Sequence, residues 1–331
     1  MKDTKVKKVL TLLSGGLDST LATRLIKDMG FEITALNFNT TFCTCNKKGC
    51  QFESKKVANE FKIPLKVMNV TKEYVQVVRN PKFGYGSGMN PCIDCRIFMF
   101  KKAKEYMQEV GASFIITGEV LGQRPMSQNR MAMKIIEKES GLEGLILRPL
   151  TSNGVNSNSK NILKDIELNK LPNISGRSRK KQLSLAKTLN IENYICGTGG
   201  CSLTDKEFIK RLKDYFEYNK ENNLDEIKLL KIGRHFRLDN NTKLIVGRNE
   251  EENKTLNNYR DMGIFFVPIK RGPNALVIGE NVNPAHLKLA GRIIGRYCKD
   301  DETEFTYTHK AETKNINLIP FKHEELGSYR I

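Results

Sequence analysis

A short glycine-containing segment near the N-terminus constrains the fold more than any other feature of the chain. Residues 14–19 read Ser-Gly-Gly-Leu-Asp-Ser, and they separate an uncharged run, residues 9–13, from a helical apolar pattern that begins near Leu21. An uncharged, β-rich run is typical of a strand buried in a parallel sheet. Two glycines between a strand and a helix let the backbone approach a phosphate, which free N–H groups at the helix start would bind. The segment lacks the lysine of the Walker loop; an ordinary Gly-Gly turn is the alternative interpretation.

Alternating strand and helix patterns continue to about residue 150, and a different pattern begins near residue 226. The first series predicts a doubly wound parallel sheet, with the ligand beyond the carboxyl ends of its strands. The later part has short β-like pieces, one helix and a polar tail. We therefore predict an α/β domain over residues 1–225 and a smaller α+β domain over 226–331, with a boundary at 222–228. The predicted strands are 32–39, 64–70, 113–117, 231–237, 243–246, 264–268 and 275–279, and the main predicted helices are 53–61, 96–110 and 286–298.

The composition indicates a large basic protein with a polyanionic partner. The chain has 331 residues and a formal net charge of +18, with a pI of about 9.5, which favours nucleic acid over a neutral ligand. A biased genome is the alternative source of the lysines. No apolar run approaches the ~20 residues that a membrane-spanning helix needs, and the N-terminus has no apolar signal core. We therefore expect a cytoplasmic protein that does not bind a membrane.

Eight cysteines without a secretion signal favour metal or redox chemistry over a disulfide framework. Cys92 and Cys95 are separated by two residues, a spacing with which thiolates ligate one metal or one face of a cluster. Cys201 follows a Gly-Gly pair and is the candidate for a third ligand. Two buried thiols without a ligand are the alternative for the pair.

A second group of cysteines lies just after the predicted strand 32–39. Cys43, Cys45 and Cys50 fall within eight residues. They could bind zinc or a second cluster, or belong to a loop specific to this lineage, and we favour the loop. Cys298 lies on an apolar helix face and is predicted to be a core residue.

The phosphate segment and the cysteines together resemble the PP-loop ATP pyrophosphatases, and within them the tRNA uridine sulfurtransferases. Residues 90–96, Asn-Pro-Cys-Ile-Asp-Cys-Arg, resemble the cysteine loop of tRNA 2-thiouridylases. Residues 117–123, Thr-Gly-Glu-Val-Leu-Gly-Gln, together with Ser127-Gln128 and 147–150, are more similar to 4-thiouridine synthetases. Residues 226–331 resemble the RNA-binding module called NFACT-R. The resemblance implies an adenine nucleotide alpha hydrolase-like fold.

The resemblance also implies a mechanism. ATP adenylates a uridine carbonyl oxygen, pyrophosphate leaves, and sulfur then displaces AMP. Asp18 would bind Mg²⁺, and Asn37, Gly118 and Gln123 would contribute to the nucleotide pocket. The residues expected to hold the pyrophosphate are Ser14, Gly15, Gly16 and Ser19.

Two routes for the sulfur remain open. In one, Cys92, Cys95 and Cys201 hold a [4Fe–4S] cluster whose fourth iron carries sulfide. In the other, one cysteine carries a persulfide and a second resolves it as a disulfide. We favour the cluster. The sulfur donor would be sulfide or a cysteine desulfurase, and a homodimer is left open.

Two basic regions are predicted to contact tRNA phosphates, with solvated charged surface as the alternative. The residues are Arg177, Arg179, Lys180, Lys181, Arg234, Arg237, Arg248, Lys270 and Arg271. The similarity of residues 117–128 favours 4-thiouridine as the product over 2-thiouridine at the wobble position. Two other functions compete: a PP-loop ligase or amidotransferase acting on a small molecule, and an RNA-binding protein with a vestigial nucleotide site.

Overall fold

The computed structural model describes residues 7–44, 50–151, 166, 170–192, 194, 200–298, 303–309 and 312–331. These residues form two compact units, 1–205 and 206–331. Within the described ranges, no helix combines the length and the apolar character that spanning a bilayer requires.

The first unit is a five-stranded parallel sheet in the order β3-β2-β1-β4-β5, which confirms the predicted α/β class. Its strands are β1 (Lys8–Leu12), β2 (Glu32–Asn39), β3 (Leu65–Asn69), β4 (Ile115–Ile116) and β5 (Ile146–Leu147). Its helices are α1 (Leu17–Asp28), α2 (Cys50–Glu60), α3 (Thr71–Arg79), α4 (Cys92–Glu109), α5 (Arg130–Ser140), α7 (Lys180–Thr188) and the 3₁₀ turn η2 (Ser202–Thr204).

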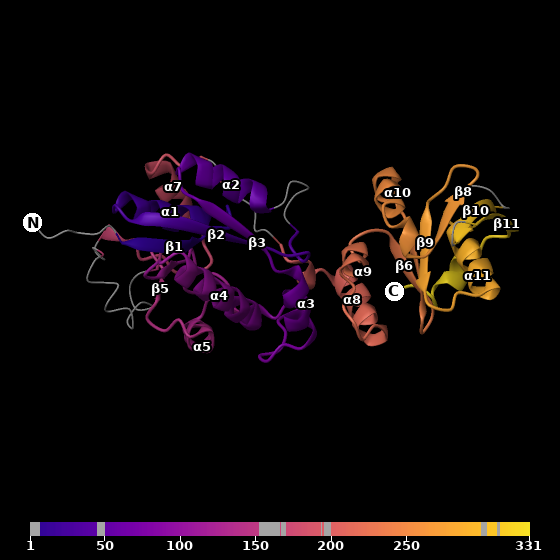
Figure 1. Cartoon of the computed structure of the whole chain (residues 1–331), viewed down its shortest axis with the longest axis horizontal. Helices are drawn as coiled ribbons and strands as arrows, with labels where there is room; N and C mark the ends of the chain where they lie inside the picture. Colours follow the sequence, from indigo (N-terminus) through magenta and orange to yellow (C-terminus); the bar gives the residue numbers. More distant parts are fainter. Residues whose placement is uncertain are drawn as a thin grey trace, which may run out of the picture. The chain divides into compact units, whose positions relative to one another are not determined.

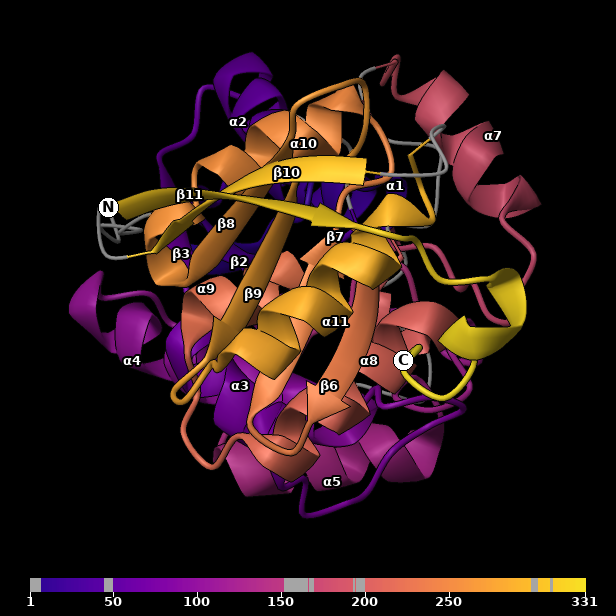
Figure 2. The same ribbon diagram turned by 90° about the vertical axis from the view of Figure 1, so that its right-hand side faces the viewer.

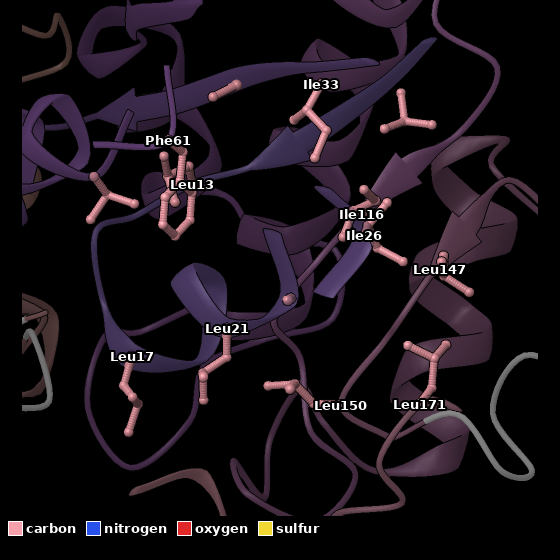
Figure 3. Packing of buried hydrophobic residues seen from close by; sticks show 14 of the residues in the cluster. Leu13, Leu17, Leu21, Ile26, Ile33, Phe61, Ile116, Leu147, Leu150 and Leu171 are labelled. Atoms are coloured by element: carbon pink, nitrogen blue, oxygen red, sulfur yellow. The ribbon is translucent and has the colours of Figure 1, made fainter. Parts of the chain in front are cut away.

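Successive residues of β1 enter two different cores, as strand geometry requires. Val9 packs with residues of α1 and α2 and with Ala186 of α7, the helices above the sheet in Figure 1. Figure 3 shows Leu17 and Leu21 of α1 and Ile33 of β2 within this core. Leu10 instead packs on the opposite face with α4 and α5. Both faces of the sheet are covered, so its functional surface is the edge where the strands end.

The second unit contains a six-stranded antiparallel sheet in the order β11-β10-β8-β9-β7-β6. Its strands are β6 (Arg234–Asp239), β7 (Thr242–Val246), β8 (Ile264–Pro268), β9 (Ala275–Gly279), β10 (Thr303–His309) and β11 (Glu312–Leu318). Its helical elements are α8 (Lys206–Tyr218), α9 (Leu224–Leu229), α10 (Glu250–Asn257), η3 (Arg260–Met262), α11 (Pro284–Gly295) and η4 (His323–Leu326). Helix α11 crosses one face of the sheet (Figure 2) and buries Ile293 and Ile294 against it.

Two features of the second unit differ from the sequence-based expectation. The residues after α11 were predicted to be a polar tail, but they form β10 and β11, since Phe305 is fully buried and packs on Phe266. The division between the units falls before α8 and not at 222–228. Helix α8 belongs with the second sheet because Asp214 of this helix accepts two hydrogen bonds from Arg237 and forms an ion pair with Lys243 at 3.2 Å.

The burial of Lys243 predicts an unusual rise of stability at alkaline pH. Burial lowers the pKa of Lys243 to about 8, although Asp214 opposes this shift, whereas an unfolded chain has a lysine pKa of about 10.4. Between these values the unfolded state binds the extra proton, so stability contributed by this site increases with pH. Urea unfolding from pH 8 to 10 should therefore show wild type gaining stability relative to Lys243→Met. The matched variant Lys254→Met removes an exposed lysine of α10 and should show no such gain; a pH-independent difference for Lys243→Met would contradict the assignment.

Candidate nucleotide and thiol site

The predicted phosphate loop connects β1 to α1 at the carboxyl edge of the parallel sheet. Gly15 has φ +76°, and a Cβ there would lie 2.7 Å from Glu53 Cβ, so only glycine fits. The Oγ atoms of Ser14 and Ser19 lie 3.0 Å apart, and Ser19 Oγ donates to the Gly16 carbonyl. No side chain caps the start of α1 at Gly16. The first N–H groups of this helix are therefore available to an anion.

Asp18 projects from the first turn of α1 and is held by a chain of amides. Gln123 Nε2 donates to Asp18 Oδ2 at 2.6 Å, and Gln182 Nε2 donates to Gln123 Oε1 at 2.8 Å. Arg179 Nη2 lies 3.7 Å from the same Asp18 oxygen. Asp18 Oδ1 is buried and accepts no hydrogen bond from the described residues. A fixed carboxylate oxygen of this kind fits a Mg²⁺ ligand.

A cavity of about 320 Å³ lies over the phosphate loop. Six of the residues predicted to bind the nucleotide line it: Ser14, Gly16, Asp18, Ser19, Asn37 and Gly118. Gly15 and Gln123 are not among its lining residues, and Gln123 instead donates to Asp18. Four acceptor atoms of lining residues are buried without a hydrogen-bond donor in the described structure: Asp18 Oδ1, Asn37 Oδ1, Glu119 Oε1 and Gln128 Oε1. Buried acceptors are normally satisfied. The amino and hydroxyl donors of a nucleoside would satisfy them, so the cavity fits a nucleotide.

Three arginines, Arg96, Arg124 and Arg179, line the same cavity. Loss of hydration, together with the charges of Arg96 and Arg179, lowers the pKa of Arg124, and Asp18 and Cys92 oppose this shift. Such a group of guanidinium ions fits phosphate oxygens. Arg179 was predicted to contact RNA, but it lies in this cavity. Arg96 and Arg124 were not predicted, although Arg96 directly follows Cys95 in the cysteine motif.

The three predicted thiols lie in one neighbourhood at the start of α4 and before η2. Burial raises the pKa of the Cys201 thiol to about 11; a backbone hydrogen bond from Leu203 opposes this rise, and the neighbouring Cys95, Cys92 and Cys43 contribute to it. Burial also raises the pKa of Cys95, opposed by a hydrogen bond from Tyr74 and by Arg96. Cys95 lines the cavity together with Asp18, and Cys43 lines it too, whereas Cys92 and Cys201 are not among its lining residues.

Among the described residues, no group of three or more His, Cys, Asp or Glu side chains is placed to hold a metal ion. A [4Fe–4S] cluster binds each thiolate through a different iron and therefore takes more widely spaced ligands. Cys92 accepts a hydrogen bond from Asn90 at 3.1 Å, whereas Asp94 is turned away and accepts from the backbone of Lys82 and Phe83.

Cys43 belongs to the same group of thiols, which the sequence did not predict. Cys43 and Cys201 are opposite each other in an antiparallel bridge. The flanking hydrogen bonds run from Thr44 N to the Gly200 carbonyl and from Ser202 N to the Phe42 carbonyl. Cys43 and Cys201 are therefore a non-hydrogen-bonded pair, the arrangement that brings opposite side chains closest. Cys45 and the side chain of Cys50 lie outside the described residues, and Cys298 packs against the core of the second unit as predicted.

The predicted RNA-binding side chains differ in what they contact. Arg237 binds Asp214 and covers the ring of Tyr218, and Arg248 binds Glu252. Arg234 donates to the Gly247 carbonyl and covers the ring of Tyr297. The remaining five are exposed: Arg177, Lys180, Lys181, Lys270 and Arg271.

Comparison with known families agrees with this geometry. Residues 4–170, half of the chain, match the family model described as thiamine biosynthesis protein (ThiI). The chain belongs to the ThiI family. Residues 233–330 of this ThiI-family chain match the model of the NFACT protein RNA-binding domain, which agrees with the predicted resemblance.

Individual relatives of this ThiI-family chain are distant. The tRNA-specific 2-thiouridylase MnmA of Petrotoga mobilis is 29% identical over 148 residues, which is 40% of each chain. MnmA 2 of Clostridium botulinum is 21% identical over 96% of this chain and 89% of its own length. The chain thus spans well under two thirds of the first of these relatives. A crystal structure of a 4-thiouridine synthetase–RNA complex with bound ATP is 23% identical, with a TM-score of 0.37 over 56% of this chain and 52% of that one.

The bridge between Cys43 and Cys201 predicts a specific disulfide. Opposite residues at such a position have Cα atoms about 4.5 Å apart, within the range that a disulfide spans. Treatment of metal-free protein with oxidised glutathione should join these two cysteines, and dithiothreitol should separate them, as read by peptide mass mapping without reduction. Cys43→Ser should leave Cys201 unlinked, while Cys298→Ser should change nothing. Joining of Cys201 to Cys92 or Cys95 in place of Cys43 would contradict this arrangement.

Proposed function

We propose that the protein thiolates a uridine of tRNA at the expense of ATP, releasing AMP and pyrophosphate, with 4-thiouridine as the product. The observation that carries this proposal is that Asp18 of the phosphate loop and Cys95 line one cavity. A ligase acting on a small molecule needs the carboxylate of the phosphate loop but has no need of a thiol beside it. The match of residues 233–330 to an RNA-binding domain supports a polynucleotide substrate.

The residues have distinct roles in this reaction. The N-terminal amides of α1 hold the pyrophosphate group. Asp18 would hold Mg²⁺, which would supply positive charge to stabilise the leaving oxygen. Gln123 acts as a positioning residue, because it fixes one Asp18 oxygen and leaves the other free. Arg96, Arg124 and Arg179, which line the cavity, bind phosphate oxygens. Asn37 and Gln128 accept hydrogen bonds from the nucleoside.

Cys92, Cys95 and Cys201 would hold a [4Fe–4S] cluster, which supplies an iron with an open position for sulfide. The hydrogen bond from Tyr74 opposes the rise that burial causes in the pKa of Cys95. Exposed cations on residues 177–181 and 270–271 bind the tRNA backbone through its phosphates, without reading sequence.

Nucleoside analysis of tRNA tests the reaction. Wild-type protein with ATP, sulfide and tRNA should yield 4-thiouridine by mass spectrometry, and a deletion strain should lack it. Asp18→Asn should lower thiolation at least a hundredfold, since it removes the negative charge with which the side chain would bind Mg²⁺. The affinity for tRNA should stay within about twofold. The matched variant Asp28→Asn changes a carboxylate at the far end of α1 and should be active. Loss of 2-thiouridine alone from tRNA of the deletion strain would reassign the ring position. Turnover of ATP by the protein with a metabolite and without RNA would contradict the proposal.

Anaerobic purification tests the cluster. The wild-type protein should be brown, with about four irons per chain, and Ala at position 92, 95 or 201 should lower iron content and thiolation together. Cys298→Ala is the control that should keep both. A colourless and fully active wild-type protein would favour the persulfide route.

A further inference from the structure

Glu119 is a cavity residue to which the proposed function has not yet assigned a role. It follows Gly118 after β4, and its side chain is 2% exposed. Arg148 is completely buried and donates to Glu119 Oε2 at 3.0 Å, and it also pairs with Glu137 of α5. This contact fixes the orientation of the Glu119 carboxylate and directs its other oxygen away from Arg148.

The second oxygen, Glu119 Oε1, accepts no hydrogen bond from the described residues and belongs to a residue that lines the cavity. Arg96 Nε lies 3.5 Å from this oxygen and forms an ion pair with it, without a hydrogen bond. A carboxylate is an acceptor only, so the missing partner is an N–H or O–H donor from a ligand.

The neighbours of Glu119 in the chain and in space connect it with both the phosphate loop and the thiol of Cys95. A Cβ on Gly118 would lie 2.5 Å from the backbone carbon of Asp18, so this segment touches the phosphate loop. Arg96, which forms the ion pair with Glu119 Oε1, directly follows Cys95 in α4. One carbonyl group of the base has to be reached by ATP at the phosphate loop and by sulfur near Cys95. A base in that position would lie beside Glu119.

We propose that Glu119 Oε1 accepts the N3–H of the target uracil and takes its proton when the neighbouring carbonyl oxygen is adenylated. The inference rests on the proposed thiolation. The base oxygen forms a bond to the α-phosphorus, the bond from that phosphorus to pyrophosphate breaks, and the N–H electron pair becomes a C=N bond. The proton moves to Glu119 and returns to N3 after hydrosulfide has displaced AMP and lost its own proton to water.

This role selects the base but not the ring position. N3–H lies between both carbonyl groups of uracil, so the same acceptor serves 2- or 4-thiolation. Cytosine presents an acceptor at N3 and would leave Glu119 unpaired, which a buried polar site rejects strongly.

Paired variants at the two carboxylates around Arg148 test the proposal. Glu119→Gln and Glu137→Gln each remove one partner of Arg148, but only Glu119 lines the cavity. The single-turnover rate of thiouridine formation should fall about a hundredfold or more for Glu119→Gln and only a few-fold for Glu137→Gln. The Glu119→Gln rate should rise with pH as N3–H ionises in solution, and its ATP affinity by calorimetry should stay within about twofold.

Each contrary result has a separate meaning. Equal losses in both variants would leave Glu119 as a support for Arg148, and a parallel loss of ATP affinity would assign Oε1 to the ATP nucleoside; either overturns the proposal. If Glu119→Gln does not fold, Glu119→Asp keeps the charge beside Arg148 but withdraws the oxygen from the cavity, and full activity of that variant is the overturning result. Absence of thiouridine with wild-type protein would refute the proposed function itself.

Discussion

The contact between Gly118 and the phosphate loop is the constraint on which the rest of the site depends. Strand β4 pairs with β1 through Leu10 and Ile115, so the two strands end at the same edge of the sheet. Any side chain at position 118 would overlap the backbone of Asp18 and Ser19. Because the two segments touch, the residues after Gly118 reach the phosphate loop directly. Gln123 can then hold Asp18, and Glu119 faces the same cavity.

The charges of the cavity are balanced only when an anion is bound. Three arginines line it, against two carboxylates, and one of these, Glu119, is already paired with the buried Arg148. The excess positive charge attracts a polyphosphate, and the low dielectric of the walls strengthens that attraction. The buried acceptors that lack a hydrogen-bond donor in the described structure complement these cations, since they need the N–H and O–H donors of a base or ribose. Buried groups of this kind lower stability unless a ligand satisfies them, as expected where binding and not stability has shaped the residues.

Local patterns predicted the elements whose periodicity is strong, and they missed contacts between distant segments. The bounds of β8 and β9 agree with the prediction because their apolar residues run without interruption, and those of β2 agree although polar residues interrupt its apolar ones. Strands β10 and β11 were missed because Thr, Asn, Lys and Glu dominate them, leaving few apolar residues to mark the buried face. The phosphate loop was found because all its parts lie within six residues. Cys43 was not assigned to the thiol group because its partner, Cys201, lies in a distant part of the chain.

Contacts between distant segments also decide how many of the cations behind the net charge of +18 are available to RNA. Arg237 and Lys243 share Asp214, and Arg248 is paired with Glu252. A cation held in this way attracts phosphate less than a solvated one, since its field is already compensated at short range. The cations at 177, 180 and 181 and at 270 and 271 are exposed and can replace counterions on a polynucleotide. Such contacts supply affinity without choosing a base. Choice of the base therefore falls to the cavity, where acceptors such as Glu119 Oε1 have a fixed direction.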